Sequence, residues 1–306
     1  DMLSQTKVGS ILGQPTLFDF DDDSFVEIIF NARQNPTDYF FAYRYINSNL
    51  QQEFNITLNN EADFGGIKCL NINGVNSCVF KDKLNYIHTV NLDTKTDSSY
   101  YTSAYNETRQ TVPAIGDIDN DGNPEAVFWF NNDSGGGYGF LAFDLNDRRV
   151  DWIVDIIFVS ALGHWSTFIL KGQPVLVDLN NDNKLEVAAS VFYNDNILSH
   201  DVNDDWFTEL FVYNSTGGKL FSKCEKNPSG ITCNDGSSGP GGDSKLEGTN
   251  PFVIDINKDG VDDICFIKDK KLFYNFKNMT INCYNYSGSL IYDAELSTPT
   301  DTVKTA

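Results

Sequence analysis

The sequence predicts an all-β fold made of repeated four-stranded antiparallel sheets, the blades of a β-propeller. Three observations support this fold class. An acidic loop with constant internal spacing occurs four times, each time between short apolar runs rich in β-branched and aromatic residues. A second strand–turn–strand pattern follows each loop. Long stretches with a helical period of 3.6 are scarce, while 13% of the residues are aromatic. Together these patterns indicate a repeat architecture.

The acidic loops span residues 19–27, 117–125, 178–186 and 255–263. Each has oxygen-bearing side chains at loop positions 1, 3, 5 and 9 and an apolar residue at position 2. Oxygen ligands at alternating positions of a tight loop suit a hard cation such as Ca²⁺, so we expect up to four calcium sites. The predicted side-chain ligands are Asp19, Asp21, Asp23, Glu27, Asp117, Asp119, Asp121, Glu125, Asp178, Asn180, Asp182, Glu186, Asp255, Asn257, Asp259 and Asp263.

Acidic loops of this length also occur in two other settings. A helical EF-hand loop needs a bidentate Glu at position 12. That position holds Phe30, Phe128, Ala189 and Phe266, and the flanks resemble strands, so the loop is expected to join two strands of a hairpin. Ordinary acidic turns without an ion are the second alternative. Turn chemistry does not explain an acid that recurs at position 9, so the metal site is favoured.

The repeating unit is strand, acidic loop, strand, linker, strand, turn, strand. Successive first ligands are 98, 61 and 77 residues apart, and the first gap has room for a blade without an acidic loop, whose first hairpin turns at 73–76. We expect a propeller over 14–295, with segments 1–13 and 296–306 as closing or connecting pieces. About five blades are expected, either a complete ring or part of a larger propeller, at 14–58, 64–108, 112–156, 172–224 and 250–295.

The loops resemble the calcium loops of FG-GAP (VCBS-type) repeats, which occur in the integrin α-chain propeller and in many secreted propellers. The extracellular T-cell immunomodulatory protein family is a looser likeness. The resemblance implies that a backbone carbonyl at position 7 completes each site, which assigns this role to Phe25, Asn123, Lys184 and Val261. The sequence departs from the family in lacking clear FG and GAP signatures and in having Ser24 and Asn183 instead of glycine at position 6.

The cysteines and the N-x-Ser/Thr sequons favour an extracellular location. Six cysteines form sequence-near couples and lack zinc-type spacing, so local disulfides are expected at Cys69–Cys78, Cys224–Cys233 and Cys265–Cys283. Glycosylation is expected at the sequons of Asn55, Asn106, Asn132, Asn214, Asn278 and Asn285. We expect a secreted or cell-surface piece with no membrane span of its own, because no apolar run is long enough.

The net charge of −21 argues against nucleic acid or an anionic membrane surface as partner. Fourteen of the acids lie at ligand positions of the loops. Four bound Ca²⁺ ions would change the net charge from −21 to −13, so much of the acidity belongs to the predicted sites.

No catalytic or phosphate-binding motif occurs, and the histidines His88, His164 and His200 are scattered, so no enzymatic activity is expected. His164 lies in a connection between predicted blades, where it is a candidate contact on a propeller face or, alternatively, a packed loop residue. The tyrosines at 43, 45, 100 and 101 are candidates for stacking on sugars if they are exposed.

The favoured function is a calcium-stabilised recognition or adhesion module that binds a protein or glycan through its loops. The alternatives are a structural subunit that binds copies of itself in an extracellular coat or filament, and a secreted carbohydrate-active enzyme on a propeller scaffold. Asn214 and Asn285 are predicted to lie on equivalent outer turns, where their glycans would project from the rim and leave other surfaces for contacts.

Overall fold

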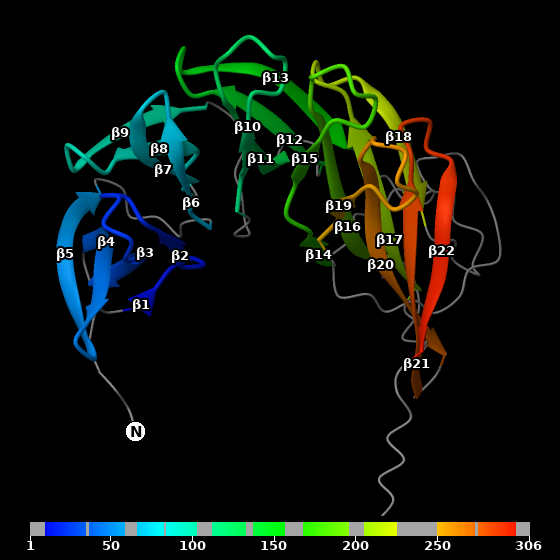
Figure 1. Cartoon of the computed structure of the whole chain (residues 1–306), viewed down its shortest axis with the longest axis horizontal. Coiled ribbons are helices and arrows are strands. Elements are labelled where there is room, and N and C mark those ends of the chain that lie inside the picture. Colours follow the sequence, from blue (N-terminus) through cyan, green and yellow to red (C-terminus); the bar gives the residue numbers. More distant parts are fainter. Residues whose placement is uncertain are drawn as a thin grey trace, which may run out of the picture. The chain divides into compact units, whose positions relative to one another are not determined.

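The computed structural model describes residues 10–34, 37–58, 66–82, 84–102, 112–132, 137–156, 168–195, 205–224, 250–272 and 275–297. These residues form five antiparallel sheets, and the chain divides into two compact units (Figure 1). One unit comprises residues 1–117 and 122–157, and the other comprises 118–121 and 158–306. The predicted all-β class and the blade-like strand order are confirmed.

The first unit contains three sheets. Strands pair with their neighbours in sequence, except that β1 and β2 both pair with β3. The first sheet contains β1 (Ser10–Ile11), β2 (Thr16–Phe18), β3 (Glu27–Gln34), β4 (Thr37–Ile46) and β5 (Asn49–Leu58). The second contains β6 (Lys68–Ile72), β7 (Val75–Lys81), β8 (Tyr86–Asn91) and β9 (Thr96–Tyr101). The third contains β10 (Ala114–Gly116), β11 (Glu125–Asn132), β12 (Gly137–Asp144) and β13 (Arg149–Ile156).

The second unit contains two sheets of the same kind. The fourth sheet contains β14 (Phe168–Lys171), β15 (Val175–Val177), β16 (Glu186–Asp195), β17 (Asp205–Tyr213) and β18 (Lys219–Cys224). The fifth contains β19 (Phe252–Ile254), β20 (Asp263–Leu272), β21 (Asn275–Tyr284) and β22 (Leu290–Ser297).

The first edge position of two sheets is shared by two short strands. In the first sheet β1 and β2 both pair with β3, and in the fourth sheet β14 and β15 both pair with β16. The segment between the two short strands also bonds the second strand: the N–H of Leu12 donates to the Asn31 carbonyl of β3, and the N–H of Gly172 donates to the Ser190 carbonyl of β16, at 2.9 and 2.8 Å. Each sheet therefore keeps four strand positions although its first strand is interrupted.

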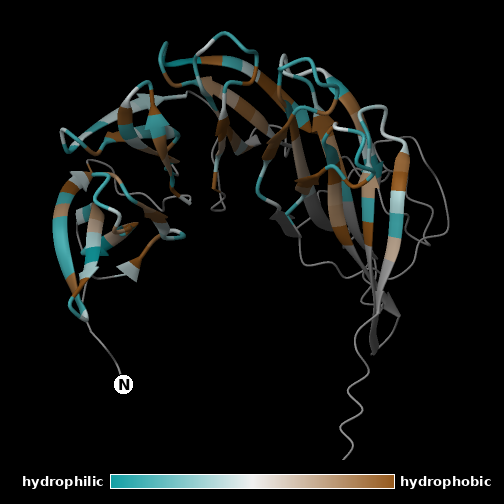
Figure 2. Cartoon of the chain, viewed as in Figure 1, coloured by the Kyte–Doolittle hydropathy of each residue, from teal (hydrophilic) through white to brown (hydrophobic). Residues whose placement is uncertain are grey.

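Neighbouring sheets within each unit pack through apolar side chains. Figure 2 shows segments of hydrophobic residues, in brown, along the strands. Between the first and second sheets, the Phe40 ring lies 6.2 Å from Phe54 and 6.1 Å from Phe80. Phe128 and Phe143 lead a similar cluster between the second and third sheets, as Leu210 and Phe266 do between the fourth and fifth. Full burial of such a side chain stabilises the fold by about 1.5–3 kcal/mol.

Two of the predicted disulfides are present in the described residues. Cys69–Cys78 joins β6 to β7 across a tight hairpin, and Cys265–Cys283 joins β20 to β21, with Cα atoms 4.0 and 4.1 Å apart. Both couples are directly opposed in strand register. The predicted Cys224–Cys233 bond lies outside the described residues because Cys233 does. Disulfides of this kind are typical of an oxidising compartment.

The second sheet has no acidic loop, as predicted. Its first hairpin turns at Asn73 and Gly74, whose φ angles of 51° and 85° are both left-handed. Two consecutive positive φ values define the two-residue turn that suits the twist of a hairpin. The disulfide between Cys69 and Cys78 closes this hairpin in place of a cation.

A buried histidine links β8 to β9 in the second sheet. His88 is 1% exposed, and its ring stacks on Phe80 at 4.7 Å. Its Nδ1 lies 2.9 Å from a carboxylate oxygen of Asp97, and its Nε2 lies 3.4 Å from one of Asp82. Burial by itself lowers the pKa of His88, but the hydrogen bonds and charges of Asp82 and Asp97 outweigh it, and the pKa is raised above 6.5.

We therefore expect His88→Gln to cost more stability at pH 5.5 than at pH 8.5. A histidine whose folded-state pKa is raised stabilises the fold fully below its unfolded pKa, and this contribution is lost as the pH rises through the folded pKa. Charge-assisted hydrogen bonds contribute about 1.5–3 kcal/mol each, which sets the expected difference. Urea denaturation of both proteins at the two pH values, with saturating Ca²⁺ throughout, measures it. Equal losses at both pH values would show that His88 is not protonated in the folded state.

Candidate metal sites

The four acidic loops each join the first edge strand to the second strand of a sheet, as predicted for a hairpin loop. They connect β2 to β3, β10 to β11, β15 to β16 and β19 to β20. Because the strands alternate in direction, the turn between the third and fourth strands lies at the same end of each sheet. The acidic loop and the outer hairpin turn are thus neighbours in every one of these sheets.

The backbone of the four loops follows one pattern. Positions 4 and 6 have left-handed φ in every copy, between 56° and 93°. Asp22, Asn120, Asn181 and Lys258 are the residues at position 4, and Ser24, Gly122, Asn183 and Gly260 are those at position 6. The N–H of position 6 donates to Oδ2 of the position 1 aspartate in all four loops, at 2.9–3.0 Å. Ser24 and Asn183 therefore adopt the conformation for which glycine is best suited.

The apolar residue at position 2 anchors the loop to the core. Phe20, Ile118 and Leu179 are buried, and Ile256 is half-buried. The Phe20 ring packs edge-on against Phe54 at 5.7 Å, within the cluster between the first two sheets. This contact explains why position 2 is apolar in every copy while its neighbours are acidic.

The acid at position 9 is buried in all four loops. Glu27, Glu125, Glu186 and Asp263 are at most 3% exposed. In three loops this carboxylate accepts the N–H of position 2, over 3.3, 2.8 and 3.2 Å. A buried carboxylate is costly unless a positive charge or several hydrogen bonds compensate it. A cation beside each position 9 carboxylate would offset the cost of burying its charge.

Burial, together with the charges of neighbouring aspartates, raises the pKa of the position 9 acid in the third and fourth loops. Burial, followed by the charges of Asp182 and Asp178, raises the pKa of Glu186 to about 7. Burial and the neighbouring Asp259 and Asp255 raise the pKa of Asp263 as well. A divalent cation among these oxygens would stabilise the ionised carboxylates.

The donor set fits calcium in three loops. In the second loop, oxygens of Asp117, Asp119 and Glu125 all lie within 4.8 Å of one another. In the third loop the N–H of Asp182 donates to oxygens of both Asp178 and Asn180, at 3.1 and 3.0 Å, so these oxygens lie close together. The fourth loop repeats this arrangement with Asp259, Asp255 and Asn257. Carboxylate and amide oxygens clustered in this way are what Ca²⁺ coordinates.

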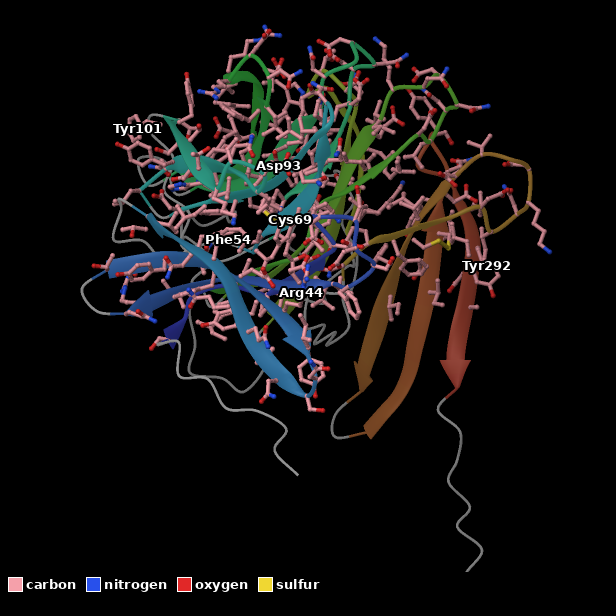
Figure 3. All side chains as sticks on the ribbon, turned by 60° about the vertical axis from the view of Figure 1, so that its left-hand side comes forward. Arg44, Phe54, Cys69, Asp93, Tyr101 and Tyr292 are labelled. Atoms are coloured by element: carbon pink, nitrogen blue, oxygen red, sulfur yellow. A yellow bond between two sulfur atoms is a disulfide. The ribbon has the colours of Figure 1, made fainter. Side chains whose placement is uncertain are left out.

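The first loop has the same acids but contains a cation of the chain itself. Oxygens of Asp19, Asp21 and Glu27 also lie within 4.8 Å of one another. The guanidinium of Arg44, from β4, contacts Asp21, Asp23 and Glu27 at 2.7, 2.8 and 3.0 Å. Arg44 is labelled in Figure 3. No sequence pattern predicted this residue, because it comes from the third strand of the sheet.

In the third sheet an acid, Asp144, takes the place that the basic Arg44 has in the first sheet. Asp144 ends β12 and pairs in register with Glu125. Its Oδ1 accepts the N–H groups of Asn146 and Asp147, both at 2.8 Å, and its Oδ2 is buried without a hydrogen-bond partner. Glu125, Asp144 and Asp151 form a second acidic group that shares Glu125 with the loop, and Arg149 lies 3.3 Å from Asp151. Asp144 was also not among the predicted site residues.

The predicted glycosylation sites lie in different settings. Asn55 is exposed on β5. Asn214 and Asn285 occupy equivalent turns, where each Oδ1 accepts the N–H groups of the residues two and four positions ahead, at 2.7–3.1 Å. The hydroxyl of the sequon residue, Thr216 or Ser287, bonds the same oxygen at 3.0 or 2.7 Å.

Two further sequons lie in strands, Asn132 in β11 and Asn278 in β21. Asn106, His164 and His200 lie outside the described residues. Tyr43 is not available for stacking on a sugar, because it is only 5% exposed and its ring stacks on Phe30 at 5.7 Å.

No protein-family model and no curated protein matches the chain. Among solved structures, the chain is similar to Kuenenia stuttgartiensis hydrazine synthase, with 13% identity and a TM-score of 0.48, over 88% of this chain and 64% of that one. It is also similar to rhamnogalacturonan lyase YesW, with 13% identity and a TM-score of 0.38. Bacillus licheniformis rhamnogalacturonan lyase PL11 has 11% identity and a TM-score of 0.39. Each lyase match covers 95% of this chain and 54% of the other. At this level, similarity is not evidence about an activity or a site of this chain.

We expect Asp117→Ala to remove one calcium ion per chain and Asn123→Ala to remove none. Position 1 supplies a carboxylate, whereas position 7 is predicted to supply only its backbone carbonyl, which alanine retains. The side chain of Asn123 instead accepts a hydrogen bond from Asn146 Nδ2 in the neighbouring turn. Bound calcium in dialysed protein, measured by mass spectrometry, compares the two variants. Equal stoichiometry in both would show that the assigned ligand positions are wrong.

Proposed function

We propose that this chain is a calcium-stabilised extracellular recognition module whose blade-like sheets present a protein- or glycan-binding surface. Calcium fits the donor sets of the loops at 117–125, 178–186 and 255–263, and the disulfides fit an oxidising environment. Within the described residues, no helix is long and apolar enough to cross a membrane. The resemblance of the loops to FG-GAP repeats, which recur in adhesion propellers, supports the same role.

Exposed tyrosines are the observation on which the recognition role depends. Tyr45, Tyr100 and Tyr101 are 43%, 39% and 52% exposed on the first and second sheets. Tyr101 is labelled in Figure 3 at the edge of the second sheet. Tyrosine combines a flat apolar face with a polar tip, and it is enriched at binding surfaces for this reason.

Packing holds two of these rings in place. The Tyr101 ring lies 5.2 Å from that of Tyr86, and the Tyr100 ring lies 5.1 Å from that of Phe143. A ring that is ordered before binding loses little conformational entropy when a ligand stacks on it. Tyr100 and Tyr101 are therefore the best candidates for direct ligand contacts.

The test is a binding screen of the calcium-loaded protein against an array of glycans and a panel of extracellular proteins. The double variant Tyr100→Ser/Tyr101→Ser should weaken binding of the ligand found by at least about tenfold, since aromatic anchors often contribute more than 1 kcal/mol. Tyr292→Ser is the matched control, because Tyr292 is 41% exposed on β22 of the second unit. Loss of binding in the control alone would contradict the proposed surface.

Two other results would favour the alternative functions. Ordered polymers of the purified protein in electron micrographs, with no ligand found, would indicate a structural subunit of a coat or filament. Turnover of a polysaccharide would indicate a secreted enzyme.

Glycan mapping tests the predicted modification. Occupied sequons at Asn214 and Asn285 are expected, with partner contacts that avoid these turns. The turns lie at the same end of their sheets as the acidic loops, so glycans there would restrict access to that end. An interface centred on unglycosylated turns at Asn214 and Asn285 would contradict this arrangement.

A further inference from the structure

We infer that the first acidic loop takes no calcium, because the Arg44 guanidinium fills its cation position and makes this loop an internal ion-pair lock. The inference rests on the proposed role of calcium in the other loops. It predicts three calcium ions per chain, at 117–125, 178–186 and 255–263, although four loops have the ligand pattern.

Strand register shows that Arg44 occupies an equivalent position in the repeat. Arg44 pairs with the position 9 acid Glu27, and Asp144 pairs with Glu125. In the fourth and fifth sheets the pairing ends one residue earlier, at Tyr213 opposite Val187 and at Tyr284 opposite Ile264. The next residues, Asn214 and Asn285, therefore occupy the position opposite the position 9 acid. A register irregularity precedes this position by one or two residues in all four sheets, between Ala42/Tyr43, Ala142/Phe143, Val212/Tyr213 and Cys283/Tyr284. The four sheets therefore differ in charge at one shared position.

The turn between the third and fourth strands also differs between the first sheet and the other three. Asp144, Asn214 and Asn285 each use Oδ1 to bond backbone N–H groups of the following turn. In the first sheet β4 continues to Ile46, and a two-residue turn follows at Asn47 and Ser48, with φ of 50° and 64°. The longer strand leaves the side chain of Arg44 free of any turn-capping role.

The contacts of Arg44 match the demands of the loop. Its three guanidinium nitrogens reach three of the four acidic ligands at 2.7–3.0 Å, and its Nε also lies 3.5 Å from Glu53. The Arg44 side chain is 12% exposed, and the Glu27 side chain beside it is fully buried. The fixed fork of a guanidinium suits such a set of carboxylates. In the first loop the buried position 9 acid, Glu27, is thus paired with the positive charge of Arg44, the role proposed for calcium in the other loops.

Calcium would have to displace this guanidinium. Ca²⁺ binds about six to eight oxygens, and three of the loop's side-chain ligands already bond Arg44. The two cations would also repel each other at close range. Asp19 keeps a buried Oδ1 without a hydrogen-bond partner, which Arg44 does not contact. Calcium could therefore use the carboxylates of Asp21, Asp23 and Glu27 only after the guanidinium had moved away.

Calcium stoichiometry in wild type and variants tests the inference. We expect three ions per wild-type chain by mass spectrometry of dialysed protein, and four in Arg44→Asn, which carries the residue of the fourth and fifth sheets. Arg33→Asn is the matched control, because Arg33 pairs with Asp38 on the same two strands, near the end opposite to the pair of Glu27 and Arg44. It should retain three ions.

A second pair of variants keeps the test decisive if Arg44→Asn does not fold. Asp19 and Asp117 both occupy position 1, and Asp19 makes no contact with Arg44 among the ion pairs described. Asp19→Ala should leave three ions, and Asp117→Ala should leave two. Four ions in wild type, with one lost in Asp19→Ala, would overturn the inference and leave the calcium proposal intact. No bound ion in any variant would overturn the calcium proposal, and with it the contrast between the loops.

Discussion

Removal of calcium by EDTA should lower the melting temperature of this protein by about 5–10 °C for each site emptied within a unit of this size. An ion that binds only the folded state adds about 2.7 kcal/mol per site at a hundredfold excess over Kd. The buried acids explain the size of the effect. Without an ion, Glu186 and Asp263 face the charges of their own loops inside the fold.

Differential scanning calorimetry with and without EDTA measures this effect. The second unit contains two of the loops that fit calcium, at 178–186 and 255–263, so its transition should shift the most. Calcium added back in excess should restore the original curve, and magnesium should restore less of it, because Mg²⁺ demands stricter octahedral geometry. An unchanged melting curve in EDTA would show that calcium does not stabilise this fold.

The double variant Cys265→Ala/Cys283→Ala should lose about 3 kcal/mol of unfolding free energy. The bond closes a sequence separation of 18 residues and joins the two central strands of the fifth sheet. Both cysteines are fully buried, so alanine also leaves space in the core.

Urea denaturation in saturating calcium measures this loss, because it keeps the metal contribution constant. Cys69→Ala/Cys78→Ala is the matched control, with a separation of 9 residues and an expected loss about 0.5 kcal/mol smaller. A loss below about 1 kcal/mol for the fifth-sheet pair would mean that this bond contributes little to the stability of its sheet.

The sequence was sufficient to predict the features that depend on local spacing. Oxygen ligands at positions 1, 3, 5 and 9 identify a hairpin loop, because position 2 must enter the core and position 9 must begin the next strand. The buried Phe20 and Glu27 show both constraints in the first loop. The cysteine couples were predictable for the same reason, since Cys69 and Cys78 flank one short hairpin.

Features that depend on contacts between distant strands were not predictable from spacing. Arg44 lies 23 residues after Asp21, and only strand register brings the two side chains together. Asp144 faces Glu125 for the same reason. Tyr43 resembles an exposed strand residue in the sequence, but the stack with Phe30 buries it. The interrupted first strands also depend on register, because β1 and β2 both pair with β3, and β14 and β15 both pair with β16.

The most direct test is a crystal structure of the calcium-saturated protein with anomalous diffraction data, which locate each calcium ion independently of the coordinates. We expect anomalous peaks among the side chains of the loops at 117–125, 178–186 and 255–263, and the Arg44 guanidinium without a peak at 19–27. Loops without any peak in millimolar calcium, with water molecules between their carboxylates, would contradict the calcium-stabilised fold described above.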